Sequence, residues 1–190
     1  DDKFSSSNFI KNVIMDNILP GDVYIKSREL HFDTDTARVC FLVRITDKTN
    51  VSVFDILYSM FPDRQKDFIF SISSEDIAIV KEIPINTKVE ALTKIGNNIV
   101  NTLANDYMTK VQVGIGTIVT SIKELARSFK EAQISLEIGK VFDEEENVIR
   151  YDNLGIARLI YQLPTTLCEM YMKEVFKKEL SCKKRLILLV

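Results

Sequence analysis

Apolar residues recur along this chain in two rhythms, one typical of helices and one typical of strands. A spacing near 3.6 residues predicts helices at 5–19, 22–30, 51–61, 87–107, 121–138, 154–162 and 165–180. Runs rich in β-branched and aromatic residues predict strands at 38–45, 68–72, 77–83, 111–119 and 148–151.

Residues with strong local preferences indicate where these elements begin and end. Pro20 and Gly21 are expected to end the first helix, and Thr49 or Asn50 to cap the helix that starts at residue 51. The segment 121–124, Ser-Ile-Lys-Glu, has the spacing of a capping box ahead of the fifth helix. Gly139 is expected to end that helix.

The order of the elements predicts the fold class. The strand at 38–45 is apolar almost throughout, as expected of a central strand that is covered on both faces. Four polar residues separate the strands at 68–72 and 77–83, which predicts a hairpin. The resulting order, β-α-β-β-α-β-α with a trailing strand and flanking helices, predicts an α+β fold with a ferredoxin-like mixed sheet.

We divide the chain into three parts on this basis. They are an N-terminal helical segment (1–36), an α/β domain (37–152) and C-terminal helices (153–190). Apolar side chains of the flanking helices either simply cover the sheet or exceed what one small domain buries and form a contact between two copies of the chain; we expect a homodimer. The candidate contact residues are Phe9, Ile14, Leu159 and Tyr171.

Composition narrows the possible functions. The 190 residues are 46% hydrophobic and 27% charged, with a net charge of -2, so disorder and a general attraction to nucleic acid or anionic lipid are not expected. One histidine and three cysteines without a Cys-x-x-Cys pair exclude most metal and disulfide frameworks. No apolar stretch approaches the roughly 20 residues of a membrane span. We therefore expect a cytoplasmic protein without membrane contact, and Cys40 as a small core residue.

Two motifs are similar to known ligand-binding loops, but each lacks residues that such a loop requires. Gly114-Ile115-Gly116 follows a strand, but Val119 stands where a dinucleotide-binding loop needs its third glycine. We expect these glycines to lie where a helix packs closely on the strand. The acidic run at 143–146 lacks the spaced ligands and central glycine of a calcium loop, so a solvated turn is expected.

Longer segments carry a family resemblance. The stretch VQVGIGTIVTSIKELARSFKEAQISLEIGK (111–140), followed by VIRYDNLGIARLIYQLP (148–164), resembles the degenerate GGDEF-like domain of sugar-diacid and purine-catabolism transcription regulators. NVIMDNILPGDVYIKSRELHF (12–32) is similar to the segment that leads into this domain in sugar-diacid regulators. The resemblance covers roughly residues 5–176.

The wider GGDEF class makes cyclic dinucleotides, so the resemblance raises the question of catalysis. Aligning the predicted hairpin with the signature loop puts serine side chains where glycines let a guanine nucleotide approach the backbone. One glutamate and one aspartate remain as a metal ligand and a second carboxylate. The five aligned positions are Ser73, Ser74, Glu75, Asp76 and Ile77.

The first strand of the domain argues further against catalysis. A cyclase holds magnesium there with acidic residues, whereas this strand has Arg44 and Thr46 at the aligned positions. At about 4 Å and an effective dielectric constant of about 20, two unit positive charges repel by about 4 kcal/mol, and a divalent ion is repelled about twice as strongly. A shifted alignment would bring Asp47 nearby, which keeps an active cyclase as a remote alternative. We expect no enzymatic activity, no metal and no cofactor.

The resemblance also implies a role. Regulators of this type have a sensory region, a central GGDEF-like domain and a C-terminal helix-turn-helix domain. The residues after 176 lack a helix-turn-helix pattern. We therefore expect DNA contact only through a domain absent from this chain, and a non-catalytic relay and dimerisation role for the region itself. The alternative is a sensor of a small-molecule effector or nucleotide, with its pocket beside Ser73, Ser74 and Glu75.

Overall fold

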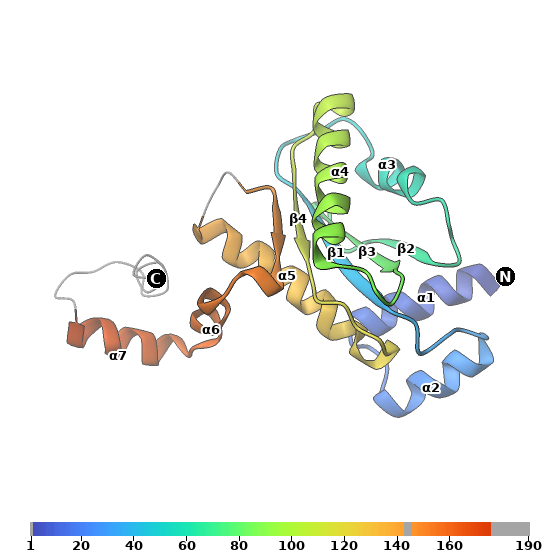
Figure 1. Cartoon of the computed structure of the whole chain (residues 1–190), viewed down its shortest axis with the longest axis horizontal. Helices are drawn as coiled ribbons and strands as arrows, with labels where there is room; N and C mark the ends of the chain where they lie inside the picture. The colour runs from blue at the N-terminus through green and yellow to red at the C-terminus, as the bar shows by residue number, and fades with distance from the viewer. Residues whose placement is uncertain (1, 143–145, 176–190) are drawn as a thin grey trace.

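A computed structural model, shown in Figure 1, describes residues 2–142 and 146–175. The elements follow one another as α1 (Asp2–Ile14), α2 (Pro20–Glu29), β1 (Arg38–Ile45), α3 (Val53–Met60), β2 (Asp67–Ser71), β3 (Asp76–Glu82), α4 (Val89–Tyr107), β4 (Val111–Ile115), α5 (Leu125–Phe142), β5 (Val148–Arg150), α6 (Ile156–Gln162) and α7 (Thr165–Val175). Short 3₁₀ helices, η1 (Ile122–Glu124) and η2 (Tyr151–Asn153), precede α5 and follow β5.

The five strands form one mixed sheet in the order β2-β3-β1-β4-β5. β1 lies at the centre and pairs antiparallel with β3 and β4, while β5 runs parallel to β4. β2 and β3 form the antiparallel hairpin that their spacing predicts. The α+β class and the ferredoxin-like mixed sheet are thus confirmed.

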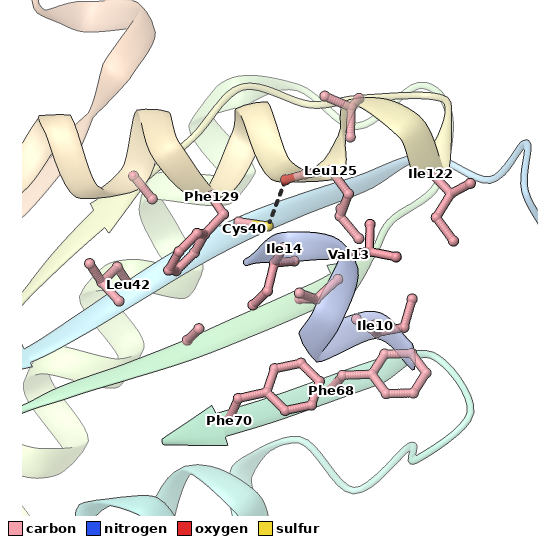
Figure 2. Packing of buried hydrophobic residues seen from close by; sticks show 14 of the residues in the cluster. Ile10, Val13, Ile14, Cys40, Leu42, Phe68, Phe70, Ile122, Leu125 and Phe129 are labelled. Carbon is pink, nitrogen blue, oxygen red and sulfur yellow. Dashed lines mark hydrogen bonds between the residues drawn. The ribbon is translucent and has the colours of Figure 1, made fainter. Parts of the chain in front are cut away.

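Both faces of the sheet are covered by helices, which explains the apolar run of β1. Because successive side chains of a strand point to opposite faces, Cys40 and Leu42 pack with α1 and α5 (Figure 2), whereas Phe41 and Val43 pack with α3 and α4. The two hydrophobic clusters lie on either side of the sheet, and β1 contributes to both.

α1 belongs to the core rather than to an outer surface. Its apolar side chains pack against β2 and α5 beside Phe68 and Phe70 (Figure 2). Phe9 and Ile14 are buried there within a single chain. The prediction that these two residues contribute to a dimer surface is therefore wrong, and they cover the sheet instead.

Several predicted element boundaries are also wrong, each for a local reason. α1 ends at Ile14, and Pro20 begins α2, where its missing N–H has no intrahelical partner to lose. Ser52, rather than Thr49 or Asn50, caps α3, and its hydroxyl accepts a hydrogen bond from the N–H of Asp55 (3.3 Å).

Glycines at helix–strand contacts account for two further observations. Gly139 lies within α5 instead of ending it, and its missing side chain leaves space for Ile149 of β5, which a Cβ there would overlap. Likewise, a Cβ on Gly114 or Gly116 would overlap the backbone of α5 at Ala132 or Ser128. The expected close packing of a helix on the Gly-Ile-Gly strand is confirmed, although β4 ends at Ile115 rather than at residue 119. Residues 143–145 of the predicted acidic turn lie outside the described residues.

None of the described helices combines the length and the apolar character that crossing a bilayer requires.

Candidate functional site

The β2–β3 hairpin carries the five residues aligned with the signature loop. The hydroxyl of Ser73 accepts hydrogen bonds from the backbone N–H groups of Glu75 (3.2 Å) and Asp76 (3.0 Å). Ser74 and Glu75 are exposed, and Ile77 is buried in the core. The tip is thus a turn held by its own serine, and two of its backbone donors are already used within the chain.

The centre of the candidate site is an ion pair between β1 and this hairpin. In the β1–β3 register Arg44 lies directly opposite Asp76. Its guanidinium donates from Nε to Oδ1 (2.8 Å) and from Nη2 to Oδ2 (2.9 Å) of Asp76, which is a bidentate pair. The remaining nitrogen, Nη1, donates to Oε1 of Glu137 on α5 (3.1 Å). One cation therefore joins strand, hairpin and helix.

The environment strengthens this pair. The side chains of Arg44 and Asp76 are only 15% and 16% exposed, so water screens them little. Hydrogen bonding to Asp76 raises the pKa of the Arg44 guanidinium above its ordinary value, and this effect exceeds the opposite effect of desolvation. The guanidinium stays charged at every pH at which the protein is folded.

The magnesium ion that the wider GGDEF class requires does not fit these residues. Both oxygens of Asp76 accept hydrogen bonds from the Arg44 guanidinium. A metal ion would need these oxygens free for coordination. Thr46 is exposed and donates its hydroxyl proton to the carbonyl of Lys110 (3.1 Å). Asp47 is exposed and lies 3.9 Å from the ammonium of Lys110. Within residues 2–142 and 146–175, no three His, Cys, Asp or Glu side chains gather as metal ligands would.

Glu137 is the site residue that the sequence reasoning missed. It lies on α5, 93 positions after Arg44 in the chain, and only the packing of α5 across the sheet brings the two together. A partial signal was present: Arg44 shares a strand face with Cys40 and Leu42, which pack against α5. Choosing among the polar residues of α5 requires the helix–sheet geometry itself.

A second polar network lies between α5 and the chain around the Gly-Ile-Gly segment. The hydroxyl of Thr117 donates to the buried carboxylate of Glu131 (2.8 Å), which also receives Arg127 (3.4 Å). The hydroxyl of Ser128 accepts from the N–H of Cys40 (3.0 Å) and donates to the carbonyl of Thr117 (2.8 Å). These groups satisfy one another and hold α5 against β1 and the segment that follows β4, which is a structural role.

The comparison with protein families decides the assignment. A model of the GGDEF-like domain family matches residues 17–138, which contain Arg44, Asp76 and Glu137. The chain belongs to the GGDEF-like domain family. The match extends from the segment before α2 into α5 and so includes four of the five strands of this GGDEF-like domain. No curated protein matches the chain significantly.

Proposed function

We propose that this GGDEF-like domain is a non-catalytic regulatory and dimerisation region of a cytoplasmic transcription regulator of the sugar-diacid type, which relays a sensory state to a helix-turn-helix DNA-binding domain. One observation carries the non-catalytic part: the guanidinium of Arg44 neutralises Asp76 and Glu137 from inside the protein. This guanidinium balances the charge of the two carboxylates as a metal ion would, but it cannot coordinate a triphosphate as a metal ion does.

The non-catalytic role is tested by incubating the chain with GTP and magnesium. No cyclic dinucleotide is expected to form, because the carboxylates are occupied and Ser73 fills the turn that a nucleotide would approach. An active cyclase assayed in parallel supplies the positive control. Product formed by the wild-type chain and abolished by Asp76→Asn would overturn the proposal.

The surface of the closing helices supports a role in protein–protein contact. Figure 1 shows α7 extending away from the body formed by the sheet and its covering helices. α6, α7 and the two-residue link between them expose several large apolar side chains, and such surfaces commonly mark association sites. They are Ile156, Leu159, Leu163, Leu167, Met170 and Tyr171. We take the partner to be a second copy of this chain.

Light scattering across a concentration series tests the dimer. The wild-type chain is expected to approach twice its monomer mass, and the double variant Leu159→Glu/Met170→Glu to remain monomeric, since charges on an apolar contact surface oppose association. Ile85→Glu places the same charge on an exposed apolar residue of another region and is expected to leave the dimer intact. A strictly monomeric wild-type chain at high concentration contradicts dimerisation.

The regulator assignment rests on the resemblance of the segments 111–140 and 148–164 to the corresponding segments of sugar-diacid regulators. Reading the coding sequence around this chain tests it. A helix-turn-helix region in the same reading frame is expected, and a reading frame without one contradicts the assignment. Calorimetry with GTP and with cyclic dinucleotides tests the competing sensor role at the hairpin, for which we expect no heat of binding.

A further inference from the structure

A second arginine of β1 is paired far less completely than Arg44. Arg38 is only 3% exposed, and its Nε and Nη1 atoms are buried without any hydrogen-bond acceptor. The nearest carboxylate, Glu82 of β3, lies 4.0 Å from Nη2, which is too far for a hydrogen bond. The ring of Phe32 lies 4.5 Å from the guanidinium carbon and attracts the cation. A ring does not replace the oxygen acceptors that the N–H groups lose on burial.

Arg38 also lines a hollow. This cavity of about 450 Å³ lies where the segment after α2, the start of β1, the segment before β2 and the end of β3 meet. Its size falls in the range of small-molecule sites. Leu30, Phe32 and Phe68 form apolar wall, and the polar residues around them are Ser6, His31, Asp33, Arg64, Gln65, Lys66 and Glu82.

The positive groups at this hollow are not equally available. The guanidinium of Arg64 donates to the backbone carbonyls of Tyr58 and Phe61, so it is already bound within the chain. Lys66 is exposed at the edge. Arg38 is therefore the buried cation that lacks acceptors, and Lys66 adds a second positive charge nearby.

We propose that this hollow binds a small organic carboxylate, whose oxygens bond to the guanidinium of Arg38 while its hydrocarbon part lies against Leu30, Phe32 and Phe68. A planar guanidinium matches a carboxylate in charge and geometry. Nε and Nη1 are buried, so the ligand enters with a movement of neighbouring side chains. The side chain of Glu82 is 25% exposed and so already reaches water.

The lining favours a carboxylate monoanion over phosphate or a nucleotide. Asp33 and Glu82 bring two negative charges to the same hollow, and each added charge on the ligand increases their repulsion. The apolar wall also leaves part of a fully polar ligand without hydrogen-bond partners. The site lies at the opposite end of β1 from the hairpin pair, because Arg38 begins the strand and Arg44 comes near its end.

The test is a titration of the full chain, followed by protein NMR, with benzoate, hexanoate, inorganic phosphate and the neutral analogue benzamide. Benzoate or hexanoate is expected to produce saturable shifts at residues around the hollow, whereas phosphate and benzamide bind at least about tenfold more weakly. Arg38→Met is expected to weaken carboxylate binding by about tenfold or more. Arg28→Met removes the same charge from the exposed surface of α2 and is expected to leave binding unchanged.

Three outcomes overturn the proposal. One is the absence of saturable binding by either carboxylate at millimolar concentration, which would mean that the hollow holds only water. Another is binding that Arg38→Met and Arg28→Met weaken equally, which would indicate general attraction to positive charge. The third is tighter binding of phosphate than of both carboxylates. Backbone NMR spectra of both variants show whether they remain folded, so a loss of binding is not confused with unfolding.

Discussion

Each end of β1 places an arginine opposite a carboxylate of β3, but only one of these two arginines is hydrogen-bonded to its opposite carboxylate. Arg38 lies opposite Glu82 and Arg44 opposite Asp76 in one antiparallel register, and both arginines point to the α5 side of the sheet. Arg44 makes three hydrogen bonds to two carboxylates at 2.8–3.1 Å. Arg38 makes none to its opposite carboxylate, which is 4.0 Å away. Cross-strand position therefore brings opposite charges near each other, but the surrounding elements decide whether they pair.

The difference arises from what covers each arginine. At the Arg44 end, α5 supplies a further carboxylate, and the hairpin holds Asp76 in place through Ser73. At the Arg38 end, the cover is the aromatic side chain of Phe32, which has no charge to offer. We interpret the first arrangement as a structural replacement for a metal ion and the second as an open position for an external anion.

The largest effect is expected from removing Arg44. Arg44→Ala leaves the largely buried Asp76 and the more exposed Glu137 without their counter-charge, and we expect a loss of about 2–4 kcal/mol in the free energy of unfolding, mostly from Asp76. Urea denaturation measures it. Lys110→Ala breaks the exposed pair with Asp47 and serves as the control, with an expected change below about 0.5 kcal/mol. Equal effects of the two substitutions would mean that the hairpin pair is no stronger than a surface contact.

Double-mutant cycles compare the two ends of the strand directly. For Arg44 and Asp76 we expect a coupling energy of about 2 kcal/mol, because two charge-assisted hydrogen bonds are lost together. For Arg38 and Glu82 we expect less than about 0.5 kcal/mol at their greater separation. Each cycle uses alanine substitutions and urea unfolding of four proteins. Similar coupling energies at both ends would remove the distinction between a paired and an unpaired arginine.

Much of this arrangement is readable from the sequence, and the limit is physical. The apolar run at 38–45 predicts a central strand, and the polar gap at 73–76 predicts the hairpin, because burial and turn chemistry are local signals. The positive charge of Arg44 on this strand is also read directly from the sequence, and the lost metal position that it indicates stays a prediction. The partner Glu137 and the unpaired state of Arg38 are not, since both depend on how α5 and the segment after α2 lie across the sheet. Burial likewise explains the error at Phe9 and Ile14: an amphipathic helix looks the same in sequence whether it packs on its own sheet or on a partner.

Cys40 lies on the same face of β1 between the two arginines, and the pKa of its thiol reports how little water reaches that face. Burial raises the pKa of its thiol to about 12. Between pH 9 and 12 the unfolded state loses the thiol proton and the folded state keeps it, so stability falls as pH rises through this window. The loss reaches about 1.4 kcal/mol by pH 10 for an ordinary unfolded pKa near 9. Urea unfolding of wild type and Cys40→Ala from pH 8 to about pH 10 isolates this contribution; parallel pH profiles would show that Cys40 does not cause it.

The smallest change in stability is expected at Arg38, and its sign is informative. Arg38→Met removes a buried cation with two unpaired N–H groups and leaves a flexible apolar chain of similar reach beside Phe32. We expect a free energy of unfolding within about 1 kcal/mol of wild type and on the stabilising side, because a buried charge with poor pairing costs more than it contributes. Urea unfolding measures the change, and a loss above about 2 kcal/mol would mean that the guanidinium of Arg38 has hydrogen-bond partners in solution.

Repeating the measurement with saturating benzoate is expected to make wild type more stable than Arg38→Met. A ligand that binds only the folded state stabilises wild type in proportion to the logarithm of its concentration. The variant, whose affinity is at least about tenfold weaker, is expected to gain at least about 1.4 kcal/mol less because its anchoring guanidinium is gone.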